Sequence, residues 1–174
     1  MQDGVDLSLK YNFNIESIGR FDLGLTGMWF NEFSVEDSDF VGTTNGRSAL
    51  NGGTIPEWTA TFLADYTRSN WRAGLSLYHV PSVIDDNASP TQTDPTRDRN
   101  VESFTRVDVY VGYQFKGGSG ILSVFDGLTV RIGSTNVFDK EPPSAAASWT
   151  DHNADTQTYG AIGRTLYVDA SLKF

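Results

Sequence analysis

The chain contains no cysteine among its 174 residues, and it carries little positive charge. Without cysteine it has no disulfide, no thiolate nucleophile and no cysteine-based metal site. The 13 lysines and arginines are outnumbered by 22 aspartates and glutamates, which leaves a net charge of -9. Nucleic-acid binding rewards basic surfaces, so this balance argues against a nucleic-acid partner. A run of about 18 uncharged apolar residues is also missing, which argues against a helical membrane protein.

A signal peptide is absent from the start of this sequence. The first residues, MQDGVDLSLKYNF, have neither the basic segment nor the apolar segment of a secretory signal. They show a strand pattern from the outset. If the protein is exported, we expect its beginning to lie upstream of Met1.

The dominant pattern of the chain is an alternation of polar and apolar residues with a period of two, which predicts β-strands. Most of these segments run to about ten residues, longer than the ~5–6 typical of globular strands. Seven segments show the pattern, with apolar positions within 5–13, 21–29, 58–66, 71–77, 107–115, 128–132 and 166–174.

The connections between these segments alternate between short and long. The long ones are polar and cover 31–55, 81–103 and 139–163. This order predicts an up-and-down meander with short turns at one end and long loops at the other. Strands of ~9–11 residues suit a tilted crossing of a bilayer, and they must close into a barrel because hydrocarbon offers no partner for open edges. The predicted fold is therefore all-β, a segment of an antiparallel up-and-down transmembrane β-barrel with about seven strands, short periplasmic turns and long outer loops.

Aromatic residues support the barrel interpretation, because many of them fall near predicted strand ends, as an interfacial girdle requires. These residues are Trp29, Phe30, Trp58, Tyr66, Trp71, Tyr78, Tyr113 and Phe115. A soluble sandwich or a lipocalin-like cup also alternates. Such folds less often sort their loops by length or place aromatics at strand ends.

The final segment, RTLYVDASLKF, has apolar residues at every second position. They are Leu166, Val168, Ala170, Leu172 and Phe174. This pattern resembles the C-terminal assembly signal of outer-membrane proteins, which implies the barrel-assembly machinery as a partner. The alternative is a chance strand at a truncated end.

A second stretch, LTVRIGSTNVFDKEPP, resembles the late-barrel motif of TonB-dependent outer-membrane receptors. The motif residues are Asn136, Val137, Phe138, Asp139, Lys140 and Glu141. In that family a loop and a Gly-Arg-aromatic strand follow, and here Gly163 and Arg164 precede Tyr167 and the terminal Phe174. Asn136 and Asp139 are expected to order the turn after the strand, since short polar side chains bind their own backbone.

The resemblance implies that residues 1–174 are the C-terminal portion of a receptor β-barrel of ~22 strands. The plug domain, the TonB-contacting segment and the signal peptide of such receptors are absent from this sequence. With about seven strands, an isolated sheet would have two unpaired edges. The implied partners are outer-membrane lipid and lipopolysaccharide, the rest of the barrel with its plug, and the TonB complex. The implied localisation is the bacterial outer membrane.

Charged residues of both signs fall on the polar side of the predicted strands. They are Asp6, Lys10, Asp22, Asp65, Arg72, Arg106, Asp108, Arg131, Asp169 and Lys173. In a barrel they would line the lumen, form ion pairs and contact the plug. Arg131 and Asp169 lie on the two strands of one predicted hairpin, so they can pair. The alternative is a solvated and functionally silent wall, because exposed ion pairs contribute little.

Signals for catalysis or metal binding are weak. The acidic groups Asp85–Asp86 and Glu36–Asp37–Asp39 lack the spacing of a calcium loop, and solvated acidic loops are the simpler interpretation. His79 and His152 lack a metal-ligand spacing. No Gly-x-Ser-x-Gly motif occurs. We therefore expect neither an enzyme nor a cofactor.

Three functional hypotheses follow. The first is energy-coupled uptake of a nutrient such as a ferric siderophore, cobalamin or an oligosaccharide, with loops 31–55, 81–103 and 139–163 as candidate ligand or phage contacts. The second is a small self-standing outer-membrane barrel of about eight strands that acts as an adhesin or envelope structural protein. The third is a soluble ligand-binding barrel.

Overall fold

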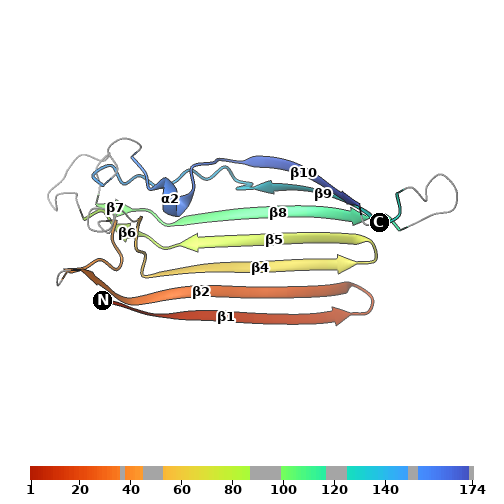
Figure 1. The fold of residues 1–174 in the computed structure, drawn as a ribbon, viewed down its shortest axis with the longest axis horizontal. Helices are drawn as coiled ribbons and strands as arrows, with labels where there is room; N and C mark the ends of the chain where they lie inside the picture. The colour runs from red at the N-terminus through yellow and green to blue at the C-terminus, as the bar shows by residue number, and fades with distance from the viewer. Residues whose placement is uncertain (36–37, 45–52, 87–98, 117–124, 149–152, 173–174) are drawn as a thin grey trace.

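The computed structural model describes residues 1–35, 38–44, 53–86, 99–116, 125–148 and 153–172. Long strands dominate this part of the chain (Figure 1). The strands of the main sheet are β1 (Gln2–Ile15), β2 (Gly19–Val35), β4 (Trp58–Arg68), β5 (Trp71–Val80), β8 (Phe104–Gln114), β9 (Leu128–Thr135) and β10 (Thr165–Leu172). The short elements are β3 (Ser38–Asp39), β6 (Val83–Ile84), β7 (Asn100–Val101) and helix α2 (Thr156–Tyr159).

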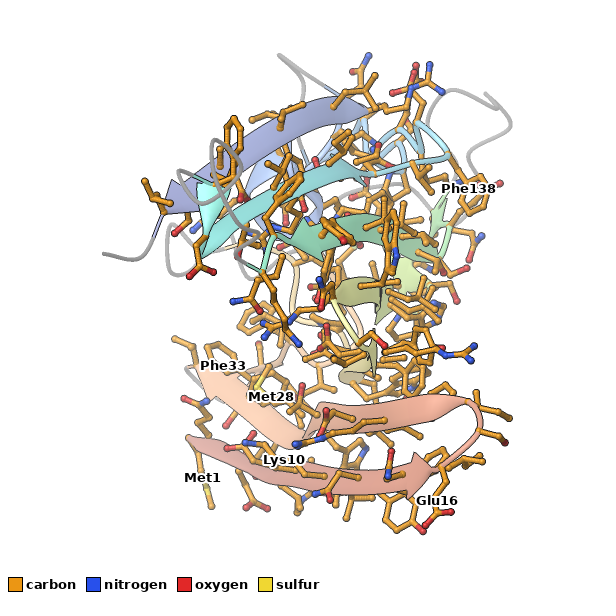
Figure 2. The ribbon with its side chains drawn as sticks, turned by 90° about the vertical axis from the view of Figure 1, so that its right-hand side faces the viewer. Met1, Lys10, Glu16, Met28, Phe33 and Phe138 are labelled. Carbon is orange, nitrogen blue, oxygen red and sulfur yellow. The ribbon has the colours of Figure 1, made fainter. Side chains whose placement is uncertain are left out.

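The long strands pair with their sequence neighbours, in the order β1-β2-β4-β5-β8-β9-β10, and every pair is antiparallel. This confirms the predicted all-β, up-and-down arrangement of seven strands. The sheet is curved but not closed, and Figure 2 shows β1 and β10 far apart at its two ends. Each of these strands pairs on one side only within the described residues, as expected for a piece of a larger barrel.

The connections sort by length between the two ends of the sheet, as predicted (Figure 1). The first long connection, however, begins later than expected. Strand β2 continues to Val35 because its pairing with β1 extends to Gln2 opposite Phe33, across an irregularity in register between Asp3 and Gly4. The prediction that the loop begins at residue 31 was therefore wrong.

The register gives the sheet one apolar and one polar face. A row across the apolar face contains Leu9, Leu25, Phe62, Leu77 and Val107, each opposite the next. The adjacent row on the polar face contains Lys10, Gly24, Leu63, Ser76 and Asp108. Because side chains alternate along a strand, each face extends over the whole sheet.

Aromatic rings border the apolar face at both ends. At the short-turn end Phe21 lies 5.0 Å from Phe13 and 5.0 Å from Tyr66, measured between ring centroids. At the loop end Trp29 is opposite Trp58, whose ring lies 5.1 Å from that of His79. Phe21 and Trp29 are about 26 Å apart along the strand at ~3.3 Å per residue. This length is close to the ~25 Å apolar band of outer-membrane barrels.

Fully buried apolar side chains concentrate at the loop end. Those with at most 2% exposure are Val80, Val83, Val101, Phe104, Ala145 and Tyr159. Apolar residues of the strands are much more accessible, as Leu7 shows with 49% exposure. Among the described residues no helix is both long and apolar enough to cross a membrane.

Candidate functional site

The three long connections fold together at one end of the sheet, and we call their described part the loop cap. It comprises residues 38–44, 53–57, 81–86, 99–103, 136–148 and 153–164. Thr43 bridges to Ile55 of the same connection and to Ile84 of the second. Val83 and Val101, on the paired strands β6 and β7, pack against Ala145 of the third. The cap therefore has a small core made from segments far apart in sequence.

Asp85 ties the three connections together through its buried carboxylate. Its Oδ1 accepts hydrogen bonds from the hydroxyls of Ser148, at 2.6 Å, and Thr44, at 3.2 Å. Its Oδ2 accepts from the backbone N–H of Ala147 at 3.1 Å. Asp85 has 0% exposure, so the interpretation of Asp85–Asp86 as a solvated acidic loop was wrong for Asp85. Its partners lie on other connections, which the local sequence does not indicate.

Asp155 makes a second link, between the first and third connections. Its Oδ1 accepts from the N–H groups of Gln157 and Thr158, at 3.0 and 3.1 Å, and so caps helix α2. Its Oδ2 accepts from the N–H of Thr54 at 2.6 Å. Burial alone would raise the pKa of this carboxyl, but the hydrogen bonds from Thr158 and Thr54 outweigh burial and lower it. Asp155 is therefore held in its charged form.

Tyr159, at the end of α2, anchors the third connection to the polar face of the sheet. Its ring meets that of Phe104 edge-on, 5.5 Å between centroids, and packs with Val80 and the partly buried Tyr78. Val80 and Phe104 are opposite each other at the ends of β5 and β8. Burial is the main cause that raises the pKa of the Tyr159 phenol to about 12.

Beside this anchor lies a hollow of about 360 Å³, which we call the mouth hollow. Strands β2, β4 and β5, the residues before β4 and helix α2 all contribute to it. Its lining residues are Met28, Phe30, Phe33, Thr54, Ile55, Pro56, Thr59, Tyr78, Gln157 and Thr158. The hollow therefore opens on the polar side of the sheet, at the end where the long connections gather.

The polar face carries ion pairs along its strands. Arg131 and Asp169 are opposite each other on β9 and β10, with 2.6 Å between guanidinium nitrogen and carboxylate oxygen, which confirms the predicted pair. Arg106 also pairs with Asp108 at 3.3 Å. The Arg131 guanidinium lies 5.2 Å from the centroid of the Tyr110 ring, within cation–π range. Lys173 lies outside the described residues.

Two tyrosines on this face cover glycines of neighbouring strands. The ring of Tyr110 lies over Gly74, and its hydroxyl donates a hydrogen bond to the carboxylate of Asp65, two strands away. The ring of Tyr167 lies over Gly133. A Cβ at either glycine would overlap the ring, so these positions need glycine for the close approach.

The motif residues 136–141 meet residues 163–164 at the start of β10. Asn136, with a φ of 50°, holds a turn through its side chain, which accepts from the N–H of Lys140 at 2.9 Å and donates to its carbonyl at 2.9 Å. Asp139, with a φ of 56°, accepts from the N–H of Arg164 at 2.7 Å. An added Cβ at Gly163 would lie 2.7 Å from the same Asp139 oxygen. These contacts are structural, and they set where the third connection leaves β9 and enters β10.

The remaining motif residues do not join this turn through side-chain contacts. The side chain of Phe138 is 76% exposed and lies at the margin of the molecule in Figure 2. The N–H of Val137 donates to the carbonyl of Val107 at 2.8 Å, and Lys140 and Glu141 are exposed.

The residues proposed as an assembly signal follow the apolar face of the edge strand. Leu166, Val168, Ala170 and Leu172 are opposite Ser134, Ile132, Val130 and Leu128 of β9. Phe174 lies outside the described residues. The structure thus places four of the five positions on one face and leaves their recognition by an assembly machinery a prediction.

The described histidine and acidic residues do not form a group that could hold a metal ion. The His79 ring lies tilted beside that of Trp58, and its Nδ1 shares a hydrogen bond with the Thr105 hydroxyl at 2.8 Å. In the described ranges no three metal-ligating side chains of His, Asp or Glu come together. Glu36, Asp37 and His152 lie outside those ranges.

Sequence reasoning missed the residues that form the loop cap. The sequence from Asp155 to Thr158 has the spacing of a helix N-cap, a signal that could have located α2. For Phe104 and Tyr159 no comparable local signal exists, since their contact joins residues distant in sequence.

Comparison with known proteins supplies the family. Residues 2–137 match the family described as TonB dependent receptor-like, beta-barrel. The chain also resembles a solved structure titled "Copper transporter OprC", with a TM-score of 0.53 and 17% sequence identity, over 98% of this chain and 23% of that chain. At this identity the likeness concerns the fold alone, and the chain spans less than a quarter of that neighbour. No match was found among curated proteins.

Proposed function

Because the chain belongs to the TonB-dependent receptor β-barrel family, we propose that it forms part of the wall and outer mouth of a transporter that imports a nutrient. Proteins of this family reside in the bacterial outer membrane, and so does this chain. They are receptors and transporters, not enzymes. The imported compound is a ferric siderophore, cobalamin or an oligosaccharide in this proposal.

The proposal rests on one observation. The sheet has an apolar face and a polar face, and the loop cap lies at one of its ends. The apolar face lies between two aromatic borders, which suits contact with lipid and, at the outer leaflet, lipopolysaccharide. The polar face, with pairs such as Arg131–Asp169, suits an aqueous lumen and a plug. The loop cap lies at the end that would face the medium and capture the ligand.

The open edges support a position within a larger barrel. Strands β1 and β10 each pair on one side only within the described residues. In a bilayer the backbone N–H and C=O groups of such open edges need hydrogen-bond partners. We place the seven strands in the C-terminal portion of the barrel, on the resemblance of residues 136–141 and 163–164 to the late-barrel motif. The plug and the TonB complex are partners of the whole receptor, and the barrel-assembly machinery is a partner during insertion.

The self-standing barrel has less support, because seven paired strands end in two open edges without closing. A soluble barrel has less still, since its apolar strand faces would need a covering core. Within the described residues, full burial of apolar side chains is confined to the loop end.

Uptake assays test the proposal. Radiolabelled ferric siderophore, cobalamin and oligosaccharide are offered to cells of the source bacterium that have or lack the gene for the receptor, and to cells that lack TonB. We expect uptake of one compound to fall in both deletion strains and to return with the receptor gene. Uptake of all three compounds that is unchanged by deletion of the receptor would contradict the proposal.

A further inference from the structure

The mouth hollow combines flat aromatic surfaces with neutral hydrogen-bonding groups. Phe30 and Phe33 meet edge-on with 6.3 Å between ring centroids, and Tyr78 also lines the hollow. On the side of α2, Gln157 contributes an amide that can both donate and accept. The volume of about 360 Å³ lies in the range of ~300–1,000 Å³ common for small-molecule sites.

Charge is absent from the lining. None of the ten residues around the hollow is acidic or basic. The nearby carboxylate of Asp155 is buried at 1% exposure and already accepts from the N–H groups of Thr54, Gln157 and Thr158. The Arg106 guanidinium lies 5.8 Å from the centroid of the Tyr78 ring but does not line the hollow. A charged ligand group would therefore find no charged side chain in the lining to replace its lost hydration. The lining therefore favours an uncharged ligand.

The lining also disfavours a bare metal ion. Met28 contributes one thioether, and the other polar side chains are hydroxyls and an amide, without a carboxylate or an imidazole. Copper and iron select thiolate, thioether or imidazole sets. A neutral molecule with an apolar side and several hydroxyl groups matches this lining better, because its apolar side can lie on the rings while its hydroxyls bind Gln157, Thr59 and Thr158.

We propose that the mouth hollow binds one neutral saccharide unit, so that the imported nutrient is an uncharged oligosaccharide. This inference rests on the proposed uptake function and adds the class of ligand. Sugar rings carry C–H groups on one face and hydroxyls around the rim, which is the combination that the aromatic walls and the amide can bind together. A binding site here would draw on β2, β4, β5 and α2, so an ordered loop cap is part of the site.

The test uses the whole receptor that contains this chain, purified from outer membranes in detergent. Binding of maltohexaose, xylohexaose, ferric enterobactin and Cu²⁺ is measured by isothermal titration calorimetry. We expect one of the two oligosaccharides to bind and the two charged probes not to compete with it. Gln157→Ala should weaken that binding about tenfold, as expected for the loss of a hydrogen-bonding group. Phe33→Leu, which keeps an apolar side chain but removes the flat ring, should weaken it as well.

Thr156→Ala is the matched control. It lies beside Gln157 on the same helix, is exposed and does not line the hollow, so binding should be unchanged. Heat-modifiable migration on gels shows that each variant barrel is folded. Binding of a charged probe alone, binding of no probe, or oligosaccharide binding that Gln157→Ala and Phe33→Leu leave intact would each overturn the inference. TonB-dependent uptake of a charged compound would overturn it while leaving the transport function standing, whereas receptor-independent uptake would remove the transport function itself.

Discussion

The loop cap and the sheet differ in what surrounds their apolar side chains. Where the loop cap meets the sheet, Phe104 at the start of β8 has 1% exposure, because Tyr159 of the cap and Val80 cover it. In the sheet Leu166 has 76% exposure, because nothing within the described chain covers the apolar face. The cap is therefore stabilised by contacts inside the chain. The apolar face of the sheet has no such cover within the described residues, and in the proposed receptor lipid and the rest of the barrel would supply it.

The largest effect is expected from a substitution that disrupts the loop cap and leaves the sheet intact. Tyr159→Ala removes the ring that packs on Phe104, and deletion of a buried aromatic ring costs about 3–5 kcal/mol. We expect residues 153–163 to become sensitive to proteases, while heat-modifiable migration of the barrel stays the same. Limited proteolysis with mass spectrometry measures the first result and gel migration the second. Cleavage equal to that of the wild type would show that the ring does not hold the cap.

The second prediction compares substitutions on the two faces of the sheet. Leu75, in the middle of β5, lies on the apolar face, and Ser76 lies on the polar face. Leu75→Arg should destabilise the barrel by about 2–4 kcal/mol, the effect of a cation near the middle of the bilayer. Ser76→Arg should have little effect, because its side chain faces water. Urea unfolding of the receptor in lipid vesicles gives both values, and equal effects at the two positions would contradict the assignment of faces.

The third prediction concerns packing within the polar face. Gly74→Ala places a methyl group where the Tyr110 ring lies, and overpacking of this kind costs roughly 1–3 kcal/mol. Gly24→Ala is the control, because its Cβ would make an ordinary contact of 3.6 Å with Leu63. The same unfolding assay should show a loss of stability for Gly74→Ala alone. Should Gly24→Ala prove equally damaging, the ring contact would not be the cause.

The smallest expected effect is a pH dependence of the cap. The pKa of Asp155 lies below its ordinary value of 3.8 in the folded chain, so its stabilising contribution is complete above that value and is lost as the pH falls below it. Cleavage of residues 153–163 by pepsin, corrected for the pH dependence of the enzyme, should therefore rise as the pH falls below 3.8.

Asp155→Asn should remove most of this pH dependence. Hydrogen bonds from the N–H groups of Phe33 and Val41 also lower the pKa of Asp39. Asp39→Asn is therefore the control, and it should leave the rise in cleavage intact. A rise of the same size in Asp155→Asn would assign the effect to another group.

Much of the sheet was predictable because its signal is local. The alternation within 58–66 and 71–77 is enough to indicate strands β4 and β5 and their two faces. The end of β2 was missed because Asn31 to Val35 contains polar residues and continues as a strand through its pairing with β1. The aromatic borders followed from residues such as Trp58 and Trp71, which stand at strand ends. The prediction was wrong for Phe30 and Tyr78, which line the mouth hollow on the polar side instead.

The loop cap was not predictable to the same degree. Asp85 is buried because Thr44 and Ser148, 41 and 63 residues away, donate to it. Helix α2 has four residues and depends on the cap at Asp155 and the anchor at Tyr159 more than on helix propensity. Contacts that join three connections have no periodic signature in the sequence, so the mouth hollow emerges only in three dimensions.

A cysteine scan along β5 tests the central claim, that lipid covers the apolar face and water the polar face. Single cysteines replace Arg72, Ala73, Leu75, Ser76 and Leu77 in the receptor, leaving Gly74 beneath the Tyr110 ring unchanged, and spin labels report accessibility to oxygen and to a water-soluble nickel chelate in vesicles. This chain has no cysteine of its own to interfere. The claim predicts oxygen access at 73, 75 and 77 and chelate access at 72 and 76. A flat profile, or the opposite phase, would contradict it.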